Sequence, residues 1–398
     1  MTRHILHLID TSTLSGPGKT IYNSCRFEDG SRYVKSVSVF TSGAVNDYVS
    51  FLRKSGITAI ELAENRANLP KLFTYIPAAL ELRRIIRERN VDLLHAHGYK
   101  ADILGLLASR MSGIKIVTTL HGYIENTRSA AVYNRLSLEA AKRMDALIAV
   151  SRAMRDRLLE KGVPDSKISV IHNAIVSGDY PRLAKSEGLI REYGIDGIFP
   201  VIGSIGRISP EKGQRVLCDA FRKIITVFPN ARLLLIGDGP DAALLKGEFP
   251  DLDGRLVITG HVKNIKEYIS VLDLHVLASY TEGLPNVVLE TSCMGKANVA
   301  TDVGGTSECL INGKTGILVR PGESAALAEA ALKVLKDPRM RSEFEKNAFE
   351  FIRKEFDFTR RVEKMHSLYD RVFSGGNACA LPRQGGTGSI SGKHEAQV

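Results

Sequence analysis

Two glutamates eight positions apart, Glu282 and Glu290, are the residues of this chain best suited to bind a sugar or a nucleotide. The intervening Pro285 suits the first turn of a helix, so we expect Glu282 in a loop and Glu290 on a helix. The first N–H groups of such a helix lack internal partners and attract an anion such as phosphate. Ionised carboxylates accept hydrogen bonds from sugar and ribose hydroxyls. A nucleotide sugar carries both kinds of group, although the bare spacing is also typical of a solvated helix start.

A second group of charged residues follows the predicted strand Phe199 to Ile205. Arg207 and Lys212 lie five positions apart on a loop between Gly206 and Gly213. A planar guanidinium and a compact ammonium can hold a diphosphate from two sides and stabilise the charge that develops on a leaving group. Without further context, two such cations are also typical of an ordinary surface loop.

Three further segments have the turn residues of loops that follow strands. Paired glycines such as Gly304 and Gly305 permit close approach of two backbones before a helix. Glycine and proline punctuate the other turns. The segments are Gly237-Asp238-Gly239-Pro240, Thr259-Gly260-His261-Val262 and Asp302 to Glu308.

Together these five elements, in their order and spacing, resemble the GT4 family of retaining glycosyltransferases with the GT-B fold. The resemblance implies a nucleotide-sugar donor, and it implies no metal and no cofactor, because Arg207 and Lys212 replace a divalent cation. It also implies that Glu290 binds the ribose and that the backbone at Val262 reads the nucleobase. The residues implied at the sugar are Glu282, Gly283, Leu284 and Asn286.

The first half of the chain matches the family less closely. Gly16 and Gly18 lie in a segment that is not a phosphate-binding P-loop, because Thr13 stands where that motif needs glycine. The segment resembles the first GT-B loop, and whether its glycines contact donor or acceptor stays open. His121 ends a predicted strand and resembles a family histidine that faces the donor sugar. The implied catalytic residues are therefore His121, Arg207, Lys212 and Glu282.

Three other polar residues of this half are expected near the crevice. His95 and His97 are two apart and share one face of a predicted strand. Since no carboxylate or cysteine lies near them in sequence, we reject a metal site and expect either to line the acceptor side. Asn173 lies in a loop that resembles another family segment.

Two series of apolar runs alternate with helical patterns, which is typical of parallel sheets covered on both faces. The sequence therefore predicts an α/β protein with two Rossmann-like doubly wound domains that face an inter-domain crevice, the GT-B fold. We expect a first domain at 1–180, a donor domain at 181–355 and a disordered tail at 374–398. The helix Thr359 to Phe373 resembles the family element that returns to the first domain. The expected strands are Ile5–Ile9, Val34–Phe40, Leu93–Ala96, Ile116–Leu120, Ala146–Val150, Phe199–Ile205, Ala231–Ile236, Leu256–Thr259, Leu274–Leu277, Ala297–Thr301 and Gly316–Val319.

Composition limits the class of protein. The 398 residues are 44% hydrophobic and 25% charged, as in a globular protein. No apolar run approaches the ~20 residues of a membrane span, and the N-terminal apolar run is too short for a signal peptide. Five scattered cysteines indicate reduced thiols rather than disulfides or a zinc site. We therefore expect the chain in the cytoplasm.

The net charge of +10 is unevenly distributed. Residues 1–180 carry 25 Lys+Arg against 17 Asp+Glu, whereas 181–398 carry 29 against 27. A basic first domain favours an anionic membrane surface as a partner, at the inner face of the cytoplasmic membrane. A solvated helix face is the alternative. No zinc-finger spacing or aromatic cluster typical of nucleic-acid binding is present in the sequence.

The expected function is transfer of a sugar from a nucleotide sugar to a glycan or lipid-linked acceptor in cell-surface polysaccharide or lipopolysaccharide assembly. The alternatives are a GT-B-fold epimerase or phosphorylase and a non-catalytic sugar-nucleotide-binding protein.

Overall fold

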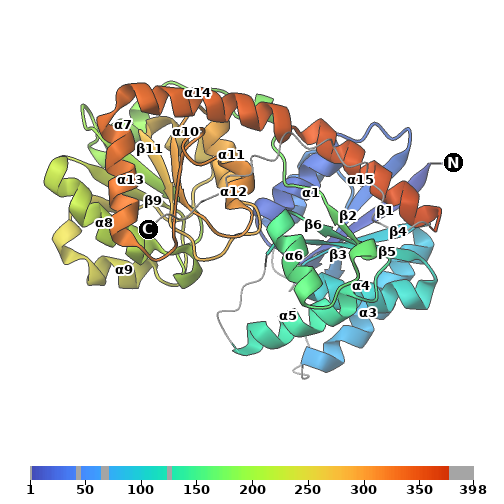
Figure 1. The fold of residues 1–398 in the computed structure, drawn as a ribbon. Helices are drawn as coiled ribbons and strands as arrows, with labels where there is room; N and C mark the ends of the chain where they lie inside the picture. Colours follow the sequence, from blue (N-terminus) through green and yellow to red (C-terminus); the bar gives the residue numbers. More distant parts are fainter. Residues whose placement is uncertain (1, 42–45, 64–70, 123–127, 376–398) are drawn as a thin grey trace, which may run out of the picture.

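The computed structural model describes residues 2–41, 46–63, 71–122 and 128–375, which fold into two α/β lobes side by side (Figure 1). Among the described residues, seven strands form one sheet in the order β3-β2-β1-β4-β5-β6-β7 and six form another in the order β10-β9-β8-β11-β12-β13. The pairs within each sheet are parallel. The predicted GT-B arrangement of two doubly wound sheets is confirmed.

The first lobe consists of strands β1–β7 and the helices packed on them. Its strands are β1 (Arg3–Ile9), β2 (Tyr33–Thr41), β3 (Ala59–Ala63), β4 (Leu93–His97), β5 (Lys115–Leu120), β6 (Ala146–Ala149) and β7 (Ile168–Val170). Its helices are α1 (Gly16–Arg26), α2 (Asp47–Lys54), α3 (Lys71–Glu88), α4 (Tyr99–Ser112), α5 (Arg128–Ala141), α6 (Arg152–Glu160) and α15 (Phe358–Phe373).

The second lobe consists of strands β8–β13 and their helices. Its strands are β8 (Val201–Ile205), β9 (Arg232–Ile236), β10 (Leu256–Ile258), β11 (Leu274–Leu277), β12 (Asn298–Thr301) and β13 (Ile317–Val319). Its helices are α7 (Glu187–Tyr193), α8 (Gln214–Val227), α9 (Ala242–Glu248), α10 (Ile265–Val271), α11 (Asn286–Cys293), α12 (Thr306–Cys309), α13 (Ser324–Lys336) and α14 (Pro338–Glu355).

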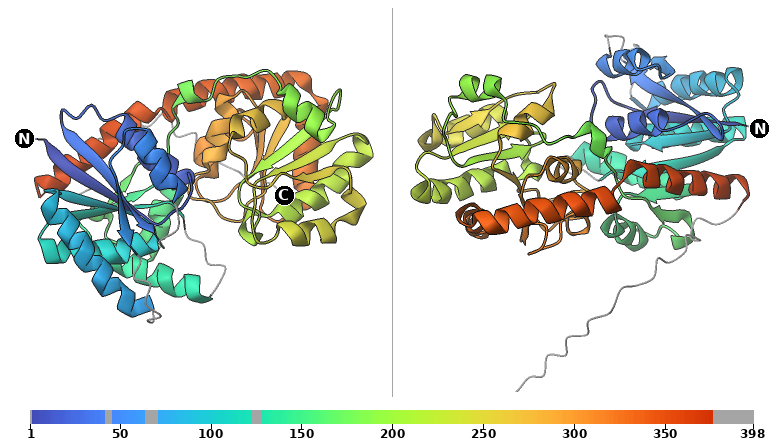
Figure 2. Two further views of the ribbon diagram at one scale, coloured as in Figure 1. Left: turned by 180° about the vertical axis from the view of Figure 1, so that it is seen from behind. Right: turned by 90° about the horizontal axis from the view of Figure 1, so that it is seen from above.

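Alternate residues of β1 face different helices of the first lobe. Leu6 and Leu8 pack in the cluster that contains residues of α3 and α4, whereas Ile5 packs with Tyr369 of α15. Both faces of this strand are thus buried, which explains why it appears in the sequence as a continuous apolar run. Figure 2 shows the helices on either side of the two sheets.

The chain crosses between the lobes at two adjacent segments. Helices α14 and α15 run across the top of both lobes in Figure 1, and the N–H of Ile175 donates to the carbonyl of Phe356 at 2.8 Å. Ile175 and Phe356 also share a hydrophobic cluster with Val150 of the first lobe and Leu284 of the second. Helix α15 packs on the first lobe, where Met365, Leu368 and Tyr369 share a cluster with Ile5 and Leu93.

The elements differ from the sequence prediction at the start of helix α1 and at strand β3, and the short strand β7 (Ile168–Val170) is also absent from the expected strands. Helix α1 begins at Gly16 rather than near Lys19, because the Ser15 hydroxyl accepts a hydrogen bond from the Gly18 N–H and Pro17 fits the first turn. Strand β3 was not predicted. Its sequence Ala-Ile-Glu-Leu-Ala suits a helix as well as a strand, and pairing with β2 decides the outcome.

The limits predicted for the two domains stay predictions, and residues 376–398 of the predicted tail lie outside the described residues. In the part of the chain that the structure describes, none of the helices has both the length and the apolar character needed to cross a bilayer.

Candidate active site between the two lobes

The predicted site residues of the second lobe lie where its strand order reverses. Strands β9 and β10 lie on one side of β8, and β11 to β13 lie on the other. The loop with Arg207 and Lys212 follows β8, and the loop with Glu282 follows β11. The carboxyl ends of two strands that diverge in this way form the usual ligand crevice of an open α/β sheet. The structure therefore brings together two segments that are 70 residues apart in sequence.

Gly283 lies where the two lobes touch. A Cβ at this position would overlap the carbonyl oxygen of His121, which directly follows β5 of the first lobe. On the other side, the N–H of Gly305 donates to the carbonyl of Gly283 at 2.9 Å. A Cβ at Gly304 would overlap the carbonyl of Glu282. The expected close approach at the paired glycines 304 and 305 is confirmed, and the loop of Glu282 lies between backbone of both lobes.

Lys212 and Glu282 form an ion pair in this crevice. Lys212 Nζ lies 2.7 Å from Glu282 Oε1, which also accepts a hydrogen bond from the Ser279 hydroxyl. Arg207 is exposed, and its guanidinium makes no hydrogen bond or ion pair with the described residues. Its side chain can therefore bind an anion without losing a protein partner.

Helix α11 begins at Asn286, with Pro285 as its N-cap, and no side chain in the described part of the protein caps its first N–H groups. The Pro285 position agrees with the predicted loop-to-helix junction. The side-chain oxygen of Asn286 is buried and accepts no hydrogen bond from any described residue. Unpaired backbone donors and one unpaired acceptor thus lie at the start of this helix.

Glu290 lies one turn further along α11 and is nearly buried. Its Oε1 accepts hydrogen bonds from Lys19 Nζ of the first lobe and from the Tyr180 hydroxyl, both at 2.8 Å. A cavity of about 30 Å³ lies beside this group, lined by Lys19, Thr20, Asn23, Ala174, Ile175, Val176, Tyr180, Asn286, Leu289 and Glu290. Lys19 and Tyr180 were not predicted as site residues. No local pattern could identify them, because only the docking of the lobes brings them to Glu290.

Gly16 and Gly18 lie in the first turn of α1 but face different surroundings. A Cβ at Gly16 would lie 3.1 Å from Asn286 Nδ2, so Gly16 adjoins the start of α11. Gly18 packs against the ring of Tyr48, whose hydroxyl donates to the Gly18 carbonyl at 2.9 Å. Of the two glycines, Gly16 is the one that the structure brings to the other predicted site residues.

The remaining loops of the second lobe pack backbone to backbone. The N–H of Ile208 donates to the Asp238 carbonyl at 2.9 Å, and a Cβ at Gly239 would overlap the backbone of Ile208. Glycine is needed at this position because a side chain would separate the two loops. Val262 is half-buried and packs against the apolar cluster of β8 and β9.

His121 and Asn173 are two predicted polar residues of the first lobe that lie beside the second lobe. Asn173 Nδ2 donates to the carbonyl of Leu284 at 3.1 Å. His121 Nε2 lies 3.2 Å from His97 Nδ1. Burial, with a smaller effect of the Arg361 charge, lowers the pKa of His121 to about 3, so its ring is neutral at physiological pH.

The expectation for the other two histidines is wrong in part. His95 is fully buried, and its two ring nitrogens lie 2.7 Å from the Tyr369 and Thr119 hydroxyls. It therefore does not line the acceptor side. His97 is also buried, and its ring nitrogens lie within hydrogen-bond distance of His7 and His121.

Glu308 makes a further contact between the lobes that was not predicted. Its carboxylate accepts hydrogen bonds from the N–H groups of Arg152 and Ala153 at the start of α6, and from His172. Burial raises the pKa of Glu308, but these hydrogen bonds outweigh that effect and hold it below its ordinary value. An ionised carboxylate at the positive end of a helix stabilises the docking of the two lobes.

Residues 37–177 match the family described as Glycosyltransferase Family 4, and residues 199–337 match Glycosyl transferases group 1. The chain is similar to the N-acetyl-alpha-D-glucosaminyl L-malate synthase of Bacillus anthracis, with 30% identity over 320 residues, 78% of this chain and 82% of the relative. It is also similar to an Escherichia coli UDP-Gal:alpha-D-GlcNAc-diphosphoundecaprenol alpha-1,3-galactosyltransferase, with 27% identity over 73% of this chain and 78% of the relative.

Among solved structures, the fold is similar to that of Anabaena HepE in complex with UDP and glucose. The TM-score is 0.80 at 23% identity, over 92% of this chain and 99% of the other. It is also similar to the lipopolysaccharide outer core galactosyltransferase WaaB, with a TM-score of 0.70 at 16% identity over 94% and 99% of the two chains. At these identities, the similarity concerns the fold alone.

Proposed function

This chain belongs to the GT4 family of glycosyltransferases with the GT-B fold, and on that premise we propose that it moves a sugar from a nucleotide sugar to a glycan or lipid-linked acceptor, with retention at the anomeric carbon. The observation that carries the donor proposal is the convergence of three features at one crevice. They are the Lys212–Glu282 ion pair, and the guanidinium of Arg207 and the first N–H groups of α11, which have no side-chain partner among the described residues. Cations and helix N–H groups suit a diphosphate, and carboxylates suit hydroxyls.

The proposed roles follow from this chemistry. Arg207 and Lys212 bind the diphosphate, and Glu290 binds the ribose hydroxyls. Lys212 must then share its charge between Glu282 and a phosphate, which leaves Glu282 Oε2 and Asn286 Oδ1 to accept hydrogen bonds from the sugar.

A uridine nucleotide is the donor class that we propose first. HepE was solved in complex with UDP and glucose, and the E. coli relative is named for UDP-Gal. The half-buried Val262, on the loop after β10, is the proposed contact of the base.

For the chemical step we propose front-side attack within the closed crevice. The bond from the anomeric carbon to the β-phosphate oxygen breaks, and the acceptor oxygen bonds to the same face of that carbon. The acceptor proton passes to the leaving diphosphate. Arg207 and Lys212 stabilise the negative charge that develops on the leaving group, which is the role a divalent cation has in other transferases. We propose that the reaction needs no metal.

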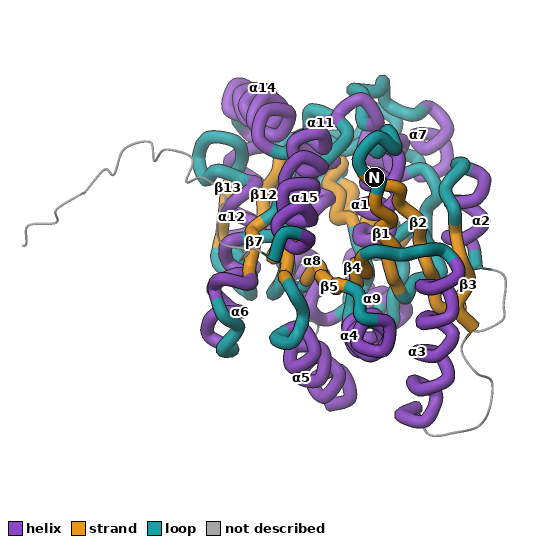
Figure 3. Tube along the Cα trace, turned by 90° about the vertical axis from the view of Figure 1, so that its right-hand side faces the viewer, coloured by secondary structure: helices purple, strands orange, loops and turns teal. Residues whose placement is uncertain are grey.

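An anionic membrane surface is proposed as a partner of the first lobe. Among its exposed large apolar side chains, six aliphatic ones lie on α3, α4 and α5: Ile76, Leu80, Leu107, Met111, Val132 and Leu136. Exposed arginines on the same helices are Arg84, Arg87, Arg110 and Arg135. These helices lie together on one side of the molecule (Figure 3). Apolar side chains flanked by cations suit the interface of an anionic bilayer.

The first experiment measures thermal shift and turnover with UDP, GDP and ADP sugars, with and without a chelator. We expect one nucleotide to stabilise the protein and its sugar to be turned over in the presence of the chelator. Arg207→Met is expected to lower turnover about 100-fold, since a group that stabilises the leaving charge contributes ~3 kcal/mol. Glu329→Ala, which replaces an exposed side chain of α13, is the control and should change neither the thermal shift nor the turnover.

The alternatives give different outcomes in the same assay. Nucleotide binding without turnover of any sugar would indicate a non-catalytic binding protein. Turnover of a free nucleotide sugar into its epimer would indicate an epimerase. Activity that the chelator abolishes would contradict the metal-independent mechanism.

A further inference from the structure

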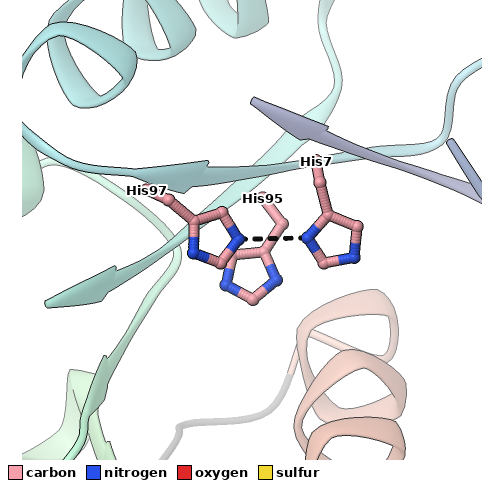
Figure 4. Close-up of side chains that lie close together, drawn as sticks. All are labelled: His7, His95 and His97. Atoms are coloured by element: carbon pink, nitrogen blue, oxygen red, sulfur yellow. Dashed lines mark hydrogen bonds between the residues drawn. The ribbon is translucent and has the colours of Figure 1, made fainter. Parts of the chain in front are cut away.

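Four histidines of the first lobe lie on one face of its sheet, and three of them form a chain of nitrogen-to-nitrogen contacts. His7 Nδ1 lies 3.0 Å from His97 Nε2 (Figure 4), and His97 Nδ1 lies 3.2 Å from His121 Nε2. This chain of histidines begins in the interior at His7 on β1 and ends at the crevice with His121. His95 lies beside it, without sharing these contacts.

Strand register explains the alignment. His7 pairs with His95 across β1 and β4, and His97 pairs with Thr119 across β4 and β5. Because side chains alternate between faces, His97 lies on the face of His95 and one step nearer the carboxyl edge. His121 follows Thr119 by two residues and continues the same progression. The three rings therefore cross the sheet diagonally towards the crevice.

A metal ion does not fit the cluster of His7, His95 and His97, although a nitrogen of each lies within 4.8 Å of the others. Both nitrogens of His95 already contact hydroxyl groups. The three rings are inclined to one another by only 26° to 33°, so their in-plane lone pairs do not converge on one point. The charges of Lys35 and Arg361 act on these rings and would oppose a cation.

The protonation of His97 couples the two contacts of the chain. Burial, with smaller effects of the neighbouring histidines and of Arg361, holds the pKa of His97 well below its ordinary value, so the ring is neutral and carries one N–H. It can donate to His121 or to His7, but not to both. Each contact needs one proton, so the direction of one hydrogen bond determines the direction of the other.

His7, at the interior end of the chain of histidines, determines the direction of these hydrogen bonds. His7 Nε2 is buried and has no partner among the described residues. If His97 donated to His7, this nitrogen would carry an unpaired N–H close to the charges of Lys35 and Arg361. In the opposite direction it carries only a lone pair, which those charges favour. Buried N–H groups without a partner are also rarer than buried unpaired acceptors.

We propose that His97 is a positioning residue: it accepts a hydrogen bond from His7 and donates one to His121 Nε2, so that His121 carries its proton on Nδ1 and presents an N–H to the crevice. His121 Nδ1 makes no hydrogen bond with the described part of the chain, so it can donate to a substrate oxygen. If the proposed function is right, that oxygen belongs to the donor sugar, and His121 acts as a neutral hydrogen-bond donor and not as a base.

The direct test is the tautomer of His121 in the whole protein without substrate. Long-range ¹H–¹⁵N correlation spectra of ¹⁵N-histidine-labelled protein distinguish the two neutral forms, and His121→Gln assigns the signal. We expect the Nδ1–H form in the wild type. The Nε2–H form or a protonated ring would overturn the proposal. This readout needs no turnover, so an inactive wild type would contradict the proposed function alone.

A kinetic test compares two replacements of His97. In His97→Asn the amide N–H can occupy the place of Nδ1–H, whereas His97→Leu has no donor. We expect His97→Leu to lower kcat about tenfold with little change in the donor KM, as for one lost hydrogen bond in the active site. We expect His97→Asn to keep most of the wild-type kcat. Equal activity of the two variants would overturn the proposal. His275→Leu replaces a buried histidine of the second lobe and controls for a general loss of stability. If the His97 variants do not fold, the tautomer of His121 in the wild-type spectrum decides the proposal.

Discussion

Lys19 Nζ lies 2.8 Å from Glu290 Oε1, an ion pair that joins helix α1 of the first lobe to helix α11 of the second. The Tyr180 hydroxyl donates to the same oxygen. Glu290 Oε2 accepts no hydrogen bond from the described residues and is the atom left for a ribose hydroxyl. The carboxylate proposed to bind the nucleotide is thus held in place from both lobes.

Replacing Lys19 should weaken nucleotide binding although Lys19 is not itself a proposed nucleotide contact. In Lys19→Met, the Glu290 carboxylate loses the cation that orients it. We expect the Kd for the nucleotide diphosphate to rise about tenfold, as for one charge-assisted hydrogen bond, measured by calorimetry. Lys333→Met, on the exposed face of α13, should bind as the wild type does. An unchanged Kd in Lys19→Met would show that Glu290 needs no support from the first lobe.

A methyl group at Gly283 should impair the docking of the lobes. It would overlap the carbonyl of His121, so Gly283→Ala forces the two backbones apart. We expect turnover to fall at least 100-fold, because a displacement of about 1 Å has this effect on catalysis. Gly247→Ala is the matched control, since its new Cβ meets no atom within 4 Å. Small-angle scattering should detect a more open shape in Gly283→Ala alone, and a compact, active variant would contradict the role of this contact.

The buried carboxyl of Asp102 should make stability depend on pH. Burial raises its pKa to about 7, although the Thr118 and Ser137 hydroxyls both donate to it at 2.5 Å. The folded state therefore holds its proton at pH values where the unfolded chain, with a pKa of about 3.9, has lost it. This contribution to stability is complete below the unfolded pKa and is lost as pH rises towards 7.

Asp102→Asn removes this titration and keeps groups that can bond to both hydroxyls. We expect the wild type to lose free energy of unfolding between pH 4.5 and pH 7.5 relative to the variant, measured by urea denaturation at both values. Glu329→Ala removes an exposed carboxylate and is measured in parallel as the control for general charge effects. Identical pH profiles for wild type and Asp102→Asn would contradict a raised pKa.

Vesicle binding should depend on the exposed apolar residues of α3 and α5. Ile76 and Val132 are 62% and 59% exposed. Replacing both with Glu should lower binding to vesicles containing anionic lipid by at least tenfold, since each apolar side chain contributes ~1 kcal/mol or more on insertion. The control is Leu244→Glu on α9 of the second lobe, which is 58% exposed. If sedimentation shows equal binding of wild type, double variant and control, the membrane is not a partner of this face.

Much of the fold could be predicted because it depends on local patterns. Strand β11 has its predicted limits, and β1, β4 and β5 lie within two residues of theirs. The placement of Glu282 in a loop and Glu290 on a helix followed from Pro285 alone. The shared face of His95 and His97 followed from the two-residue period of a strand.

The sequence by itself determined the alternation of strands and helices, the turns at glycine and proline, and the family. Only the tertiary structure decided which of these segments meet. His7 contacts His97 across 90 residues of sequence, and Lys19 contacts Glu290 across 271. Local patterns depend on the chemistry of neighbouring residues, which the sequence displays directly. Strand order, register and the docking of two lobes depend on how whole buried faces fit together, and no short segment contains that information.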